Sequence, residues 1–209
     1  TSKKISELGD KAKVVGSAVG KLGKGLAIAG TAAATAVGTM VAKSVSSFAD
    51  YEQLTGGVDT LFKDSSAAVQ KYANDAYKTA GLSANNYMET VTNFSASLIS
   101  SLKGDTAKAA DYANSALVDM ADNANKMGTN MTDIQNAYQG FAKQNYTMLD
   151  NLKLGYGGTQ AEMKRLLGDA QKLTGQKYDI SSFADITQAI HAIQTQMDIT
   201  GTTAKEAST

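Results

Sequence analysis

Hydrophobic side chains recur every three or four positions along most of this chain, from about residue 47 onward. This spacing places them on one face of an α-helix. No segment alternates hydrophobic and polar residues over the length of a strand, so we expect no β-sheet. The pattern predicts an all-α fold, an irregular multi-helix bundle. The predicted buried faces are Val69, Tyr72, Ala73, Ala76, Tyr77 and Ala80; Tyr87, Val91, Phe94, Leu98 and Leu102; Ala109, Tyr112, Ala113, Ala116, Leu117, Met120 and Ala124; Met131, Ile134, Tyr138 and Phe141; Met163, Leu166, Leu167, Ala170 and Leu173; and Phe183, Ile186, Ile190, Ile193 and Met197.

Glycines and capping residues predict where these helices begin and end. Glycine adopts the left-handed conformation that commonly ends a helix, and a short polar side chain at the N-cap accepts a free backbone N–H. The expected helix ends are Gly81, Gly104, Gly128, Gly175 and Gly201. The expected N-caps are Ser83, Asp105 or Thr106, and Ser182 or Ser181. In addition, Thr132 with Gln135 and Thr159 with Glu162 have the spacing of a capping box.

The first 47 residues have a different composition, rich in glycine and alanine. Residues 25–42 carry no charge and lie between Lys24 and Lys43. As a helix they would span about 27 Å, just under the roughly 30 Å of a bilayer core. Three interpretations stay open: a small-residue helix packed on another helix, a segment that enters a membrane at a later stage, and a constitutive transmembrane helix. The candidate membrane residues are Leu26, Ile28, Val37, Met40 and Val41.

These differences predict two regions. Residues 1–47 would form an apolar helical arm rich in small residues, and residues 48–209 a helical bundle module. The chain begins at Thr1 without a methionine and stops at Thr209 within an expected helix. We therefore expect it to be a fragment of a longer protein.

Composition narrows the chemistry. The chain contains no cysteine, which removes disulfides and thiolate metal sites and fits assembly in a reducing cytoplasm. Twenty basic residues balance twenty acidic ones, and Arg165 is the single arginine. A neutral chain lacks the basic footprint of a nucleic-acid-binding protein, so we expect no sequence-specific nucleic-acid binding.

Candidate catalytic and metal-binding residues are sparse. The single histidine, His191, lies beside a seam of isoleucines and is expected to be a packed or surface residue. Asp111, Asp119 and Asp122 could approach one another on one helix face, but a solvated face explains them better. Glu162 is accounted for by its capping box. We expect no enzyme activity, no catalytic residue, no cofactor and no metal site.

Aromatic residues surround a glycine-rich joint between two predicted helices, at residues 145–158. Aromatic rings bring a large buried area and, in tyrosine, a polar group that suits interfaces. Two interpretations stay open: the rings close one end of the bundle, or they form a docking surface for a partner or a second copy. The candidate interaction residues are Tyr138, Phe141, Tyr146, Tyr156 and Tyr178.

Several segments resemble the tape measure proteins of long-tailed bacteriophages and prophages, mostly those of Gram-positive hosts. The most specific is Tyr138–Leu167, with the sequence YQGFAKQNYTMLDNLKLGYGGTQAEMKRLL. Weaker pieces are YEQLTGGV at 51–58 with LFK at 61–63, residues 80–89, and residues 120–128. The likeness extends over most of the chain from Phe48 onward.

The resemblance implies a structural protein of the virion. Tape measure proteins occupy the lumen of the tail tube in several copies, set tail length during assembly in the host cytoplasm, and leave the tube during genome ejection. The implied partners are the tail tube protein, tail assembly chaperones, tail-tip proteins and further copies of the chain, as a homo-oligomer. During ejection residues 25–42 would contact the host membrane.

One feature departs from a simple ruler. A ruler needs a long uninterrupted helix, whereas glycines recur every 20 to 30 residues from Gly81 to Gly201. The part after Phe48 is therefore expected to be a folded module that anchors one end of the tape measure. Two alternative functions are a membrane-active helical protein acting through residues 25–42 and a muralytic enzyme domain, for which Glu89 and Glu162 are the candidate acids.

Overall fold

The computed structural model describes residues 49–208. The chain divides into two compact units, Thr1–Ala49 and Asp50–Thr209, and the description below concerns the second. Every regular element among the described residues is a helix, which confirms the predicted all-α bundle. The predicted arm and its candidate membrane residues Leu26, Ile28, Val37, Met40 and Val41 lie outside the described residues.

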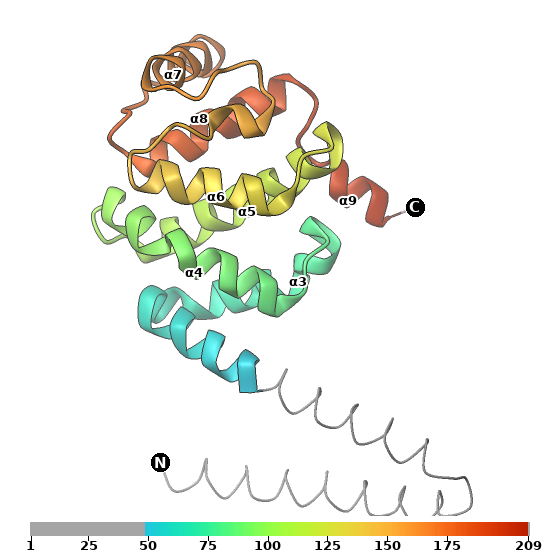
Figure 1. Ribbon diagram of the computed structural model, residues 1–209. Helices are drawn as coiled ribbons and strands as arrows, with labels where there is room; N and C mark the ends of the chain where they lie inside the picture. The colour runs from blue at the N-terminus through green and yellow to red at the C-terminus, as the bar shows by residue number, and fades with distance from the viewer. Residues whose placement is uncertain (1–48, 209) are drawn as a thin grey trace, which may run out of the picture. The chain divides into compact units, whose positions relative to one another are not determined.

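The bundle consists of helices, with longer connections before and after α7 than between the other helices (Figure 1). In chain order the elements are a helix over residues 49–62, η1 (Lys63–Ser65), α3 (Ser66–Ala80), α4 (Ala84–Ser101), α5 (Thr106–Met127), α6 (Met131–Ala142), η2 (Leu149–Leu152), α7 (Gln160–Thr174), α8 (Phe183–Gln196) and α9 (Thr202–Ala207). None of the described helices combines the length and the hydrophobicity that a membrane span requires.

Helix α5 is the centre of the bundle. It packs against α3, α4, α6, α8 and α9, whereas α7 packs mainly against α8. The buried side chains in its first half are mostly alanines, at positions 109, 110, 113 and 116. Small side chains let neighbouring helices approach closely, so one helix can serve as the packing partner of five others.

Most of the predicted helix ends are confirmed. Four predicted N-caps each accept a hydrogen bond from the backbone N–H three residues later, which satisfies one of the free donors of the first turn. These caps are Ser83, Asp105, Thr159 and Ser182. Three predicted glycines end their helices in the left-handed conformation, namely Gly81, Gly128 and Gly175.

The two predicted capping boxes are wrong in part. Asn130, not Thr132, caps α6, because its side chain accepts the Thr132 backbone N–H at 2.8 Å. Gln135 donates instead to Thr90 Oγ1 of α4, at 3.1 Å. In α7 the Glu162 carboxylate accepts the backbone N–H of Gly157, not that of the N-cap residue itself.

Three residues assigned to buried faces are exposed: Tyr77, Leu173 and Met197. Tyr77 is 75% exposed because it lies about 100° around α3 from Ala76, at the edge of a stripe made mostly of alanine. Leu173 lies in the last turn of α7, and Met197 follows the last residue of α8. The helical pattern therefore continues beyond the surface that neighbouring helices cover.

The joint between α6 and α7 folds tightly back on itself. Gly158 lies against the backbone of Thr147, so that a Cβ atom at Gly158 would overlap the Thr147 carbonyl oxygen. Similarly, a Cβ at Gly140 would lie 3.0 Å from the carbonyl oxygen of Asn145. Glycine is required at Gly158 for close approach of two backbone segments, and its φ lies outside the left-handed region.

We predict that Gly158→Ala lowers the free energy of unfolding by about 3 kcal/mol, because the new methyl group overlaps main-chain atoms that cannot move independently. Gly168→Ala is the matched control. Gly168 lies in the interior of α7 with no atom within 4 Å of the added Cβ, so the change should stabilise the chain by about 0.5–1 kcal/mol. Urea unfolding followed by circular dichroism measures both. Equal effects of the two substitutions would contradict the close backbone approach at Gly158.

Candidate functional site

Three of the five candidate interaction residues are buried. Tyr138 and Phe141 lie on α6, Tyr146 follows it, and all three belong to the hydrophobic core. Their rings form a continuous row, with centroids 5.7 Å apart for Tyr138–Phe141 and 6.4 Å apart for Phe141–Tyr146. The Tyr146 hydroxyl donates to the carbonyl oxygen of Ile180 at 2.9 Å, which ties the joint to the loop before α8.

For Tyr138, Phe141 and Tyr146, burial favours the interpretation that the rings close one end of the bundle. The stripe along α6 turns toward the core, where α4, α5, η2 and α8 cover it. A buried ring offers no surface to a partner unless the bundle opens. These aromatic residues therefore connect the joint to the rest of the bundle.

The other two candidates are partly buried and belong to separate local contacts. The Arg165 guanidinium lies 4.3 Å from the centre of the Tyr156 ring, a cation–π contact. Arg165 also donates to the Gly155 carbonyl at 2.7 Å and pairs with Glu162. Tyr178 shares a hydrogen bond with Thr174 at the end of α7. The five aromatic residues consequently do not form a single surface.

A second cluster was missed by sequence reasoning. Asp119, Asp122 and Asn123 of α5 are buried, together with Gln194 of α8. The prediction of a solvated face is wrong for Asp119 and Asp122, because α8 and α9 cover that side of α5. All five residues from Asp119 to Asn123 are buried, so this part of α5 is enclosed on every side.

The Asp122 side chain takes the place of a capping side chain for α9, a helix from another part of the chain. Its carboxylate accepts the backbone N–H of Gly201 at 2.6 Å and that of Thr203 at 2.8 Å. The N-cap position of α9 is Gly201, which has no side chain to satisfy these donors. A carboxylate at a helix N-terminus is favoured both by these hydrogen bonds and by the helix dipole. Asp122 therefore fastens α9 to α5.

Asn123 joins three further segments. Its amide nitrogen donates to the Leu152 carbonyl of η2 at 2.9 Å and to Gln194 Oε1 of α8 at 2.8 Å. Its amide oxygen accepts from Thr129 Oγ1 at 2.8 Å. Gln194 in turn donates to the backbone oxygen of Asp119 at 3.1 Å. The side-chain amide of Asn123 is thus fully used within the protein.

Asp119 pairs with the single histidine of the chain. His191 Nδ1 lies 2.9 and 3.0 Å from the two carboxylate oxygens. The side chain of Asp119 is 1% exposed and that of His191 is 39% exposed. Burial raises the pKa of Asp119, and the hydrogen bond to Asp119 raises the pKa of His191. The position of His191 beside the isoleucine seam had predicted only a packed or surface residue.

An aspartate–histidine pair can serve as a general base when a nucleophile lies on the second ring nitrogen. The hydroxyls one turn from His191 along α8 are those of Thr187 and Thr195, and they donate to the backbone oxygens of Ala184 and His191. Among residues 49–208, no three metal-ligating side chains come together. What the pair does in this arrangement is hold α8 against α5.

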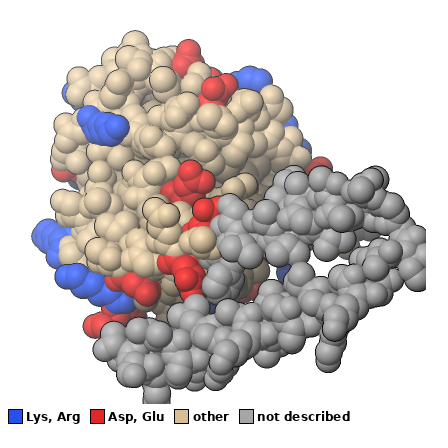
Figure 2. Space-filling view, turned by 60° about the horizontal axis from the view of Figure 1, so that its bottom comes forward, with Lys and Arg blue, Asp and Glu red and all other residues tan. Residues whose placement is uncertain are grey.

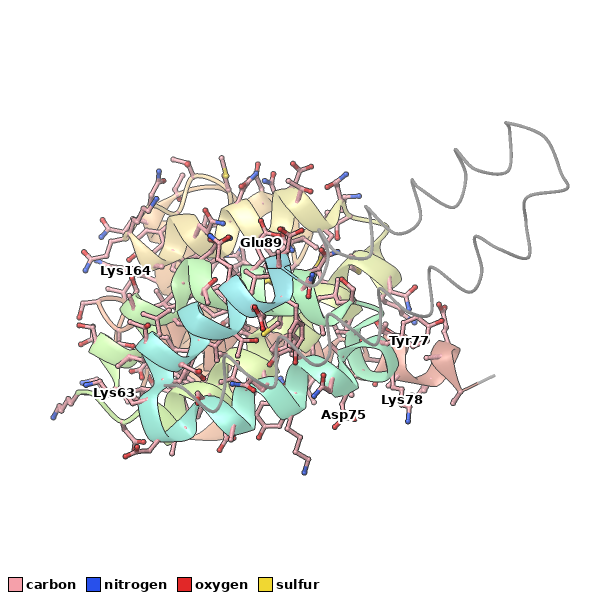
Figure 3. All side chains as sticks on the ribbon, turned by 90° about the horizontal axis from the view of Figure 1, so that it is seen from below. Lys63, Asp75, Tyr77, Lys78, Glu89 and Lys164 are labelled. Atoms are coloured by element: carbon pink, nitrogen blue, oxygen red, sulfur yellow. The ribbon has the colours of Figure 1, made fainter. Side chains whose placement is uncertain are left out.

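The two candidate muralytic acids lie at the surface. Glu162 is held by Arg165 and by the Gly157 N–H, which lower its pKa. A general acid needs the opposite shift. Glu89 of α4, which is labelled in Figure 3, is exposed.

Surface grooves are shallow on the described unit. The larger lies between α7 and residues 177–180 and is lined by Lys164, Leu167, Gly168, Gln171, Lys177, Tyr178, Asp179, Ile180 and Asp185. The smaller is lined by four residues of α4, three of them serines, and by Ala142, Gln144, Ser181 and Phe183. On the described part of the face in Figure 2, acidic and basic side chains are interspersed. Neither groove adjoins the buried cluster on α5.

A scan against protein-family models and searches of curated proteins and of solved structures found no match for this chain.

We predict that Asn123→Ala lowers the free energy of unfolding by about 2–4 kcal/mol, because it leaves the Leu152 carbonyl and the Gln194 amide oxygen buried without donors. Asn93→Ala is the matched control, since Asn93 lies exposed in α4 and its replacement should change stability by less than about 0.5 kcal/mol. Thermal and urea unfolding measure both. A loss at Asn123 no larger than that at Asn93 would show that the buried cluster contributes little.

Proposed function

We propose that this chain is part of a phage or prophage tail tape measure protein and that residues 50–208 form a folded, non-enzymatic module of it. In this proposal the protein occupies the tail tube lumen, determines tail length during assembly in the host cytoplasm, and is released during genome ejection. The resemblance of Tyr138–Leu167 to such proteins carries the proposal.

The role of this segment in the fold supports the proposal. Its residues include core members such as Tyr138, Leu152 and Leu166, together with Gly158 at the close backbone approach. The resemblance therefore falls on residues that shape the joint between α6 and α7. Residues that shape the fold suit a protein that works by occupying space and contacting neighbours.

The compactness of the unit suits a module rather than the measuring segment. Its longest described helix, α5, has 22 residues and would span about 33 Å, whereas residues 50–208 as one straight helix would span about 240 Å. A measuring segment needs that extension. We infer that the module anchors one end of the tape measure to a tail component, for which the tail tube protein, tail-tip proteins, an assembly chaperone or another copy of the chain are the candidates.

Paired deletions in the parent protein test this function. Removing residues 50–209 should abolish normal tails, because the anchor is lost. Removing the same number of residues from a continuous helical segment elsewhere should shorten the tails by about 1.5 Å per residue, roughly 240 Å. Electron microscopy of the particles measures tail length directly.

Two outcomes would contradict the proposal in different ways. Normal tails that are shortened in proportion by the loss of residues 50–209 would make this region a measuring segment instead of an anchor. Tails of unchanged length after both deletions would show that the parent protein does not determine tail length. Peptidoglycan cleavage by the purified chain that is lost on Glu89→Gln would favour the muralytic alternative.

A further inference from the structure

Segments far apart in the sequence meet at the second half of α5. The imidazole of His191 and the amide of Gln194 reach it from α8, and the backbone amides of Gly201 and Thr203 reach it from the start of α9. All of them bind polar atoms of Asp119 or Asp122. Among these groups, His191 has a side chain that is both partly exposed and able to change charge near neutral pH.

The buried carboxylate of Asp119 depends on His191 for a partner. Nδ1 of His191 makes the hydrogen bonds to both carboxylate oxygens. A buried carboxylate that loses a charged partner is strongly destabilising, because water cannot take the partner's place. With Asp119 ionised, protonation of His191 therefore strengthens the contact between α8 and α5.

Two other titratable groups lie near the pair, and one of them, Asp122, adds negative charge to its surroundings. Asp122 lies on the same helix and acts on both His191 and Asp119. From α6, Tyr138 contributes a fully buried hydroxyl that has no hydrogen-bond partner among the described residues and that interacts electrostatically with Asp119. A negative environment favours the protonated form of an imidazole.

We propose that the His191–Asp119 pair is a pH-sensitive latch that fastens α8 and α9 to α5 and loosens both helices as pH rises through neutrality.

The direction follows from proton linkage. The pKa of His191 is raised above its ordinary value of 6.5, chiefly by the hydrogen bond to Asp119. A histidine of this kind contributes stability that is fully present below pH 6.5 and is lost as pH rises through the folded-state pKa. Burial raises the pKa of Asp119 as well, so the native state also holds a proton there more readily at acidic pH, with the same sign.

The connection to α9 runs through neighbouring groups on α5. Asp119 and Asp122 lie one turn apart, and Gln194 binds the backbone oxygen of Asp119 from α8. Helix α9 has no buried residue of its own, so its attachment relies on the Asp122 cap and on packing against α3 and α5. Residues 197–201 join α8 to α9. When α8 loosens, this short connection should draw the start of α9 away from Asp122, and α9 should open with it.

Two measurements on the purified 209-residue chain test the latch. Because His191 is the single histidine, its imidazole signals in a proton NMR titration need no assignment, and the midpoint should lie above pH 6.5. Hydrogen exchange, corrected for the intrinsic effect of pH, should show lower protection of α8 and α9 amides at about pH 8.5 than at about pH 6. The loss should be about tenfold for each pH unit by which the midpoint exceeds 6.5, while α4 keeps its protection.

His191→Asn is the decisive variant, since its amide can still donate to Asp119 but does not titrate. Between about pH 6 and pH 8.5 the variant should lose less protection in α8 and α9 than the wild type, because the contribution of His191 is gone. The same loss in the variant as in the wild type, or an equal loss in α4, would overturn the latch. If the variant does not fold, the wild-type titration still decides, because a midpoint at or below pH 6.5 is incompatible with the proposal.

Discussion

The bundle depends on the complete enclosure of residues 119–123, in the second half of α5. Once a helix is covered on every side, its polar residues must find partners within the protein, because water no longer reaches them. Asp122 and Asn123 meet this requirement by binding η2, α8 and the start of α9. These hydrogen bonds set which segments lie against α5, and so they specify the arrangement of the C-terminal third of the described unit.

The buried polar contacts matter more in this bundle because much of the helix packing is made by alanine. The first half of α5 buries small side chains at positions 109, 110, 113 and 116, which contribute little area per residue. Small, similar residues also discriminate weakly between alternative helix registers, whereas a buried asparagine or aspartate accepts few arrangements. The aromatic row of Tyr138, Phe141 and Tyr146 adds buried apolar area at the C-terminal end of α6. We infer that the alanine packing of the core is close but compatible with several helix registers, and that a few buried polar contacts select one of them.

Local features of the fold could be predicted from the sequence because they depend on neighbouring residues. Ser83 and Ser182 cap helices through atoms three positions away, and Gly81 ends α3 through its own backbone conformation. The burial of Asp119 could not be predicted in this way. It depends on α8, whose His191 follows 72 residues later, covering a face that the pattern of α5 marks as polar. A buried polar residue looks the same in sequence as a solvated one, and the aromatic joint left two interpretations open for the same reason.

The central claim is that these helices form a structural module of a tail tape measure protein. Quantitative mass spectrometry of purified tails, before and after genome ejection is triggered, tests it most directly. The account predicts peptides from residues 50–208 in several copies per intact tail, and their loss from the emptied tube. Tails that lack these peptides, or that keep them in full after ejection, would contradict it.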